Sequence, residues 1–167
     1  MLEYDAVGTL AFFGERHRVE SATTASVLSA LPSDGLSYRP HPGSSTAGTT
    51  AWTIVRGFRA ICELKSPSVE ASLEHHPDHQ WIIEQFNETS NAISKSMMEF
   101  RQRNWADERT VTSNGAIILR QPLGQILWLF HVDGIHHRGQ LSTYLRPLGV
   151  GVPSIYGPSG DQPRLPL

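Results

Sequence analysis

HVDGIHHRGQLSTYLRPLG, residues 131–149, is the stretch that decides the fold we predict for this chain. Residues four apart on an α-helix lie on one face, so Asp133 and His137 share a face, and Ile126, Phe130 and Tyr144 continue the same stripe. A carboxylate and an imidazole on a core-facing stripe are costly unless they are paired, hydrogen-bonded or bound to a metal. The stretch therefore predicts a helix that carries a polar site.

The composition is that of an ordinary single-domain protein. The chain has 167 residues, 39% hydrophobic and 18% charged, with a net charge of -2. We predict one domain over residues 1–167, with an irregular tail from about residue 148. The weak acidity gives no reason to expect a nucleic-acid partner. The lone Cys62, the absence of a signal-like N-terminus and the absence of a long apolar run favour a cytoplasmic protein without a membrane span.

Helical periodicity recurs in other parts of the chain and predicts an all-α fold. Ser45 or Thr46 is placed to cap one helix, and Pro122 sits where a helix tolerates proline well, in its first turn. Four helices are predicted, over about residues 8–31, 45–64, 77 or 81 to 103, and 122–146.

The period changes once, in ERTVTSNGAIILR, residues 108–120. β-Branched residues flank Asn114-Gly115, and this dipeptide favours the type I′ turn of a two-residue hairpin. Together these patterns predict a four-helix bundle with a small β-hairpin before the last helix.

The stretch HHRGQLSTYLRPLGVGVPSIYGPSGD, residues 136–161, resembles the C-terminal signature of the DinB/YfiT-like superfamily. The resemblance extends to ALPSDGLSYRPHPGS, residues 30–44, and to AWTIV, residues 51–55. It implies a bundle with up-down-down-up topology that is often homodimeric. It also implies a divalent metal, zinc or nickel, held by one histidine of the second helix and two histidines four apart on the last helix. Some members of the superfamily are transferases or isomerases that use a low-molecular-weight thiol.

The resemblance carries only partly onto this sequence. The histidine before Arg-Gly-Gln is His137, the position four residues earlier is Asp133, and the second-helix histidine falls on Thr53. Asp133, His137 and Thr53 are therefore the candidate metal ligands, for a zinc or nickel site that has lost one strong donor. Aspartate and neutral histidine both ligate such metals, whereas threonine is a poor zinc ligand. The alternative is a hydrogen-bonded Asp133–His137 pair in a polar core patch, with no metal.

The remaining reactive residue types favour structural roles. We expect His131 to lie on the surface or make an interhelical hydrogen bond, and His17 to be exposed or partly buried. Arg138 is expected to hydrogen-bond neighbouring helix ends or the tail. The loop EHHPDHQ, residues 74–80, has the residue types of a metal site, but Pro77 interrupts it and a solvated loop is favoured. Cys62 is expected to be a buried, inert thiol.

Two hypotheses for the function remain open. The first is a metal-dependent enzyme, a thiol-dependent transferase or hydrolase-like protein with a degenerate metal site, acting on a small-molecule thiol or substrate. The second is a non-catalytic dimeric bundle, or a small-ligand-binding protein that lacks a metal. An enzyme requires a solvent-connected cavity that ends at Asp133 and His137, whereas in a scaffold Trp52 and Phe58 would fill that space. No catalytic residue is assigned.

Overall fold

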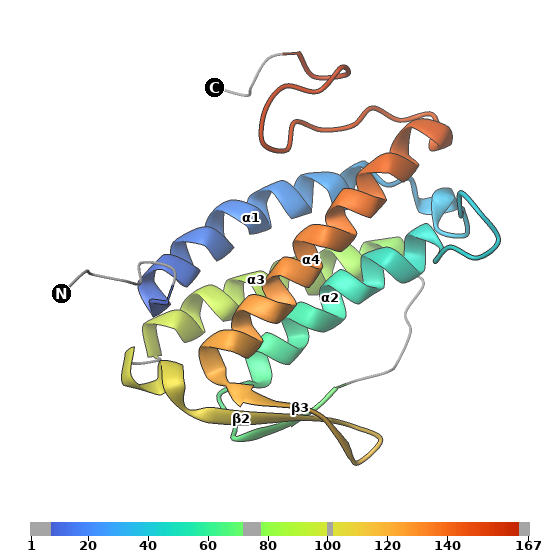
Figure 1. Ribbon diagram of the computed structural model, residues 1–167. Helices are drawn as coiled ribbons and strands as arrows, with labels where there is room; N and C mark the ends of the chain where they lie inside the picture. The colour runs from blue at the N-terminus through green and yellow to red at the C-terminus, as the bar shows by residue number, and fades with distance from the viewer. Residues whose placement is uncertain (1–7, 72–77, 100–101, 164–167) are drawn as a thin grey trace.

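Four long α-helices form the body of the protein over the part described by this computed structural model, residues 8–71, 78–99 and 102–163. Each of α1 and α2 contacts both α3 and α4. In Figure 1, α1 and α4 run in one direction across the view and α2 and α3 in the other. The helices are α1 (Leu10–Ala30), α2 (Ala47–Glu63), α3 (His79–Glu99) and α4 (Leu123–Leu145).

Local sequence signals set where the helices begin. The side chains of Thr9, Thr46 and Asp78 each accept a hydrogen bond from the backbone N–H three residues further along, at 3.1, 3.1 and 2.8 Å. Such caps satisfy N–H groups that have no partner within the helix. Pro122 directly precedes α4. The cap predicted at Thr46 is confirmed.

A small sheet lies at one end of the helices and has three strands over the described residues (Figure 1). β2 (Glu108–Ser113) pairs antiparallel with β3 (Ala116–Pro122), and Asn114 and Gly115 between them have positive φ values of 50° and 75°. β1 (Ser68–Glu70) pairs parallel with β2. The mostly helical fold is confirmed, but the predicted two-stranded hairpin is part of a larger sheet. β1 was missed because three residues in a polar loop give no periodicity.

The face of α4 that enters the core differs from the predicted one. Asp133 is exposed, whereas Phe130 and His137 are half-buried. Ile126 and Tyr144 of the predicted stripe are buried. The prediction that Asp133 and His137 face the core is wrong, because in the middle of α4 a neighbouring stripe turns inward. Its buried members are Leu127, His131, Gly134, Arg138, Leu141 and Leu145.

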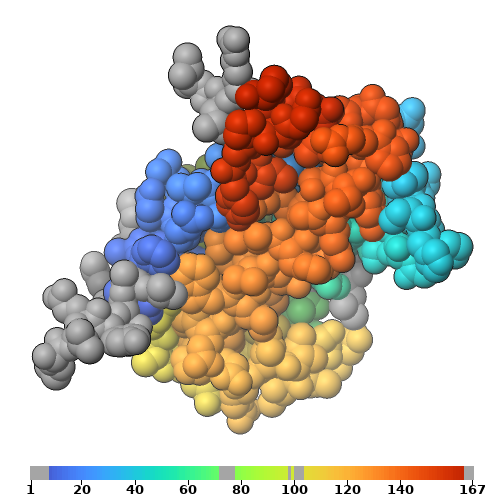
Figure 2. Space-filling view, turned by 45° about the horizontal axis from the view of Figure 1, so that its top comes forward, coloured from blue at the N-terminus to red at the C-terminus, as the bar shows by residue number. Residues whose placement is uncertain are grey.

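The C-terminal tail packs on the bundle. Val150, Val152 and Ile155 are partly buried against the hydrophobic core, as the apolar residues of the tail led us to expect. Figure 2 shows the tail lying beside α1 and α4. Within the described residues, no helix combines the length and apolar character that a membrane crossing requires.

Candidate functional site

Asp133 and His137 form a pair on the outer part of α4. His137 Nε2 lies 3.5 Å from Asp133 Oδ1, and the side chains are 23% and 47% exposed, respectively. His137 Nδ1 lies 2.8 Å from the side-chain oxygen of Gln140. Because a carbonyl oxygen only accepts hydrogen bonds, Nδ1 carries a proton in this arrangement. Nε2 therefore faces the carboxylate across a gap suited to a proton or a metal ion.

The spacing of this pair matches two corners of a metal site. Donor atoms bound to zinc at about 2.0–2.1 Å in tetrahedral geometry are about 3.3 Å apart. The 3.5 Å separation of Nε2 and Oδ1 is close to this value. A metal-ligating histidine also usually donates its other N–H to an oxygen, as His137 does to Gln140. Asp133 and His137 thus fit an ion as neighbouring ligands.

A cavity of about 160 Å³ opens between α2 and α4 beside this pair. Its helical walls include Thr53 and Gly57 on α2, and Phe130 and Asp133 on α4. Two of the three candidate ligands therefore line one cavity, while His137 lies one turn beyond Asp133. Thr53 Oγ1 donates a hydrogen bond to its own helix, at 2.9 Å from the Thr49 carbonyl oxygen.

The sheet completes the cavity, and neither Trp52 nor Phe58 fills it. Ser113 of β2 and Ile118 of β3 lie in its wall. Trp52 packs on Trp81 with ring centroids 5.2 Å apart. Phe58 packs on Phe86 at 5.1 Å. The space next to Asp133 is thus left open by the two side chains that a filled scaffold would have used.

The donor set is small. Across residues 8–71, 78–99 and 102–163, no three His, Cys, Asp or Glu side chains gather to hold an ion. Among the described residues, the strong donors here are Asp133, which lines the cavity, and His137, which lies one turn beyond it, and the Thr53 hydroxyl is in the cavity wall. Such a set fits an open, exchangeable site and does not fit a closed structural zinc site, which uses four protein ligands.

Gly57→Ala is expected to raise the free energy of unfolding by about 0.5–1 kcal/mol, because alanine loses less backbone entropy in a helix. The added Cβ would make ordinary contact with Phe130, 3.8 Å away. Urea unfolding measures the change. Gly124→Ala is the matched control, since its Cβ would lie 2.2 Å from Trp105. That variant should lose about 1–3 kcal/mol, and equal signs for the two variants would contradict the packing described.

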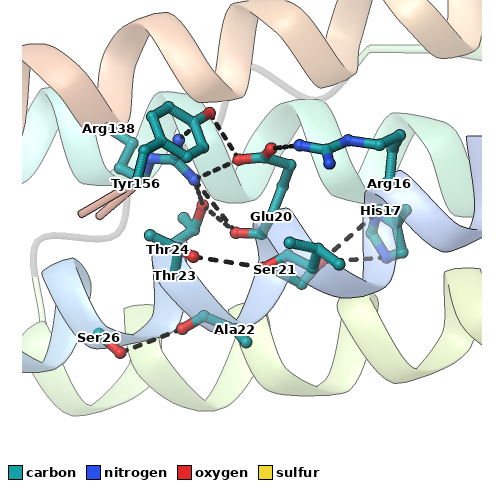
Figure 3. Close-up of polar contacts among 11 residues, drawn as sticks. Arg16, His17, Glu20, Ser21, Ala22, Thr23, Thr24, Ser26, Arg138 and Tyr156 are labelled. Carbon is teal, nitrogen blue, oxygen red and sulfur yellow. Dashed lines mark hydrogen bonds and ion pairs between the residues drawn. The ribbon is translucent and has the colours of Figure 1, made fainter. Parts of the chain in front are cut away.

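A second polar cluster is buried between α1, α4 and the tail, and Figure 3 shows it in close-up. Arg138 Nη1 donates to Glu20 Oε2 at 2.8 Å, and the two side chains are only 1% and 2% exposed. The Tyr156 hydroxyl donates to the same carboxylate at 2.8 Å and accepts from Arg138 Nη2 at 2.6 Å. Arg16, also on α1, donates to the Glu20 carboxylate, and the Thr24 hydroxyl of α1 accepts a hydrogen bond from Arg138. Arg138 therefore bonds the tail, as predicted.

The carboxylate of Glu20 remains ionised in this environment. Burial alone would raise its pKa, but hydrogen bonds from Tyr156 and Arg138 and the charge of Arg138 hold the pKa of Glu20 below its ordinary value. We call Arg16, Glu20, Thr24, Arg138 and Tyr156 the Glu20 cluster. Within it the buried charges of Glu20 and Arg138 compensate each other, and Arg138 and Glu20 both bond Tyr156, so its role is structural: it ties the tail to the bundle.

Two buried histidines lie beside the Glu20 cluster, and both sequence expectations for them were wrong. His17 is fully buried and His131 is 1% exposed, with ring centroids 5.8 Å apart. Among the described residues, neither ring nitrogen of His131 has a hydrogen-bond partner. Burial first, and the neighbouring His17 second, lower the pKa of His131 to about 4. Burial also lowers the pKa of His17. Both imidazoles are therefore neutral in the folded protein at pH 7.

The other candidates have structural roles or lie outside the described residues. Asp78 caps α3, and His79 Nε2 contacts the backbone oxygen of Leu28 at 3.2 Å. The rest of the histidine-rich loop, residues 74–77, lies outside the described range. Cys62 is half-buried and not fully buried as expected, but burial raises the pKa of its thiol to about 11, so this thiol is a poor nucleophile, as predicted.

The chain is thus a mostly helical protein with a small sheet, and its last helix carries an aspartate–histidine pair. The model of the DinB family matches residues 13–164, and the chain belongs to this family. A curated relative, the uncharacterized protein YrdA of Bacillus subtilis, is 26% identical over 157 residues and covers 92% of each chain.

Solved structures agree on the fold. A DinB-like protein from Bacillus cereus superposes with a TM-score of 0.73 at 22% identity, covering 89% of this chain and 98% of the other. The DinB-like protein YjoA of Bacillus subtilis gives a TM-score of 0.66 at 20% identity, covering 86% and 96% of the two chains. At these identities the likeness shows the fold and not the activity.

Proposed function

We propose that this protein is a metal-dependent enzyme, a thiol-dependent transferase or hydrolase-like protein, that acts on a small molecule in the cavity between α2 and α4. One observation carries the proposal. The open cavity reaches Asp133, whose carboxylate lies 3.5 Å from His137 Nε2, the ring nitrogen that does not contact Gln140. Catalytic metal sites keep open positions for water or substrate, and a site with few protein ligands has such positions.

In this proposal each residue has a defined task. Asp133 and His137 hold zinc or nickel, and Thr53 lies in the same cavity wall. Gln140 fixes the His137 ring, because its side-chain oxygen accepts a hydrogen bond from Nδ1–H. When bound, the ion supplies Lewis acidity and lowers the pKa of a bound water or thiol. Phe130 and Ile118 give the cavity apolar walls that exclude water from one side of a bound molecule.

The second candidate function is a small-ligand-binding protein that lacks a metal. It uses the same cavity, with the Asp133–His137 pair closed by a proton. We also propose a homodimer, supported by four exposed apolar side chains on β3 and α4: Ile117, Ile118, Leu129 and Val132. A cytoplasmic location is proposed from the single cysteine, which excludes an internal disulfide.

Tag-free protein is expected to bind about one equivalent of zinc, nickel or manganese, measured by elemental analysis and titration calorimetry. The variant Asp133→Ala/His137→Ala should lose this equivalent, because it lacks both strong donors. Gln140→Ala keeps the ligands but frees the His137 ring, so the metal affinity should fall by roughly 10–100-fold.

Two controls separate this site from adventitious binding. His136→Ala removes the adjacent, exposed histidine of the same helix and should leave the affinity unchanged. The variant His75→Ala/His76→Ala/His79→Ala removes the histidine side chains of the histidine-rich loop. If the metal is lost with the loop variant and kept with Asp133→Ala/His137→Ala, or if no metal binds, the enzyme proposal is wrong.

A further inference from the structure

We propose that the ligand of the α2–α4 cavity is a small organic monocarboxylate with a compact apolar body, and that Arg56 binds its carboxylate. The inference rests on the proposed function only in taking this cavity as the ligand site. It adds the charge and shape of the ligand, which the candidate metal ligands do not define.

Among the described residues that line the cavity, Arg56 is the one with a cationic side chain. It lies in the wall on α2 and is half-buried. No hydrogen bond or ion pair joins it to any residue that the structure describes. By contrast, Arg138 on α4 is paired with a carboxylate, and so is Arg146 in the turn that follows α4. A half-buried guanidinium beside apolar walls is stabilised by an anion, and its planar donors suit a carboxylate in bidentate geometry.

The other walls define the body of the ligand. Ala60, Ala71, Ile118 and Phe130 present apolar surface. A closed apolar cavity of about 150 Å³ accommodates benzene, and this one has about 160 Å³. One ring, or a branched chain of similar size, therefore fills it while its polar group lies at the rim.

Asp133 limits the ligand to one negative group. It lies in the same wall as Arg56, yet the two side chains form no ion pair within the described part of the chain. A second carboxylate on the ligand would meet the Asp133 carboxylate at close range, and like charges repel. In the metal-free protein a monocarboxylate is thus favoured over a dicarboxylate.

Three probes of nearly the same shape test the charge requirement in protein freed of metal with a chelator. Benzoate, benzamide and benzylamine are titrated in turn and followed by ligand-observed NMR. We expect benzoate to bind saturably, and benzamide and benzylamine to bind at least about tenfold more weakly, since hydrogen bonds to a charged partner are the stronger ones. Phthalate, a dicarboxylate, should bind more weakly than benzoate.

Arg56→Gln should weaken benzoate binding by at least about tenfold and leave benzamide binding unchanged. Arg59→Gln is the matched control, because Arg59 is also half-buried on α2 but does not line the cavity. Thermal melts check that both variants fold. Equal affinity for benzoate and benzamide, or no effect of Arg56→Gln, would overturn the monocarboxylate inference alone. If no probe binds at all, the monocarboxylate inference is also overturned, whereas the proposed function is decided separately by the metal titration of Asp133→Ala/His137→Ala.

Discussion

Arg138→Met is expected to lower the free energy of unfolding by about 3–5 kcal/mol, the usual cost of removing one partner of a buried ion pair. Arg138 and Glu20 are 1% and 2% exposed, so water cannot replace the lost guanidinium. Among the described residues, the Glu20 carboxylate would keep Arg16 and the Tyr156 hydroxyl as its side-chain partners. Chemical denaturation of the two proteins at pH 7 measures the difference.

Two further variants make the result specific. Glu20→Met/Arg138→Met removes both charges and should recover a large part of the loss, because apolar residues of similar volume replace buried ion pairs well. Arg146→Met breaks a surface ion pair to Asp161, in which the side chains are 59% and 35% exposed, and should cost at most about 1 kcal/mol. If Arg138→Met costs no more than Arg146→Met, the Glu20 cluster does not hold the tail as described.

The protein should lose stability between pH 7 and pH 5 because of its buried histidines. The folded-state pKa of His131 is about 4, below its ordinary value of 6.5. In this window the unfolded chain therefore binds more protons, and the free energy of unfolding falls as the pH falls. His131 alone should contribute about 2 kcal/mol of this loss. His17 acts in the same direction. The lowered pKa of Glu20 confines its effect to lower pH.

His131→Phe tests this directly. Phenylalanine suits the site, since the rings of Phe13, Phe58 and Trp128 surround His131 at centroid distances of 5.4–6.4 Å. The variant should show a shallower dependence on pH and, at pH 7, a gain of about 1–3 kcal/mol from removing unpaired buried nitrogens. His136→Phe, at an exposed position of the same helix, should keep the slope of the wild-type protein. An unchanged slope in His131→Phe would show that His131 is not the titrating group.

Local signals in the sequence were sufficient for much of the fold. Thr46 caps a helix, and Asn114-Gly115 forms a turn, through atoms only a few residues apart. The rotation of α4 was not predictable in this way. His131 and Arg138 lie seven residues apart on its buried face, but the reason that Arg138 tolerates burial is Glu20, 118 residues earlier. No local pattern records such a pairing.

For the candidate site too, local spacing was predictable and tertiary packing was not. The spacing of Asp133 and His137 predicted their proximity, and they lie 3.5 Å apart. The cavity that joins Asp133 to Thr53 and Arg56 depends on how the sheet packs over α2 and α4, which helical periodicity does not specify. The sequence shows Arg56 only as a positively charged residue close to Thr53 on the second helix, which does not reveal that it lines the cavity.

The most direct test of the proposed site is anomalous X-ray diffraction at the zinc absorption edge, from crystals of the full chain grown with zinc. The account predicts a peak about 2.0–2.2 Å from both the Asp133 carboxylate and His137 Nε2. A peak confined to the histidine-rich loop or to lattice contacts, with none at Asp133 and His137, would contradict it.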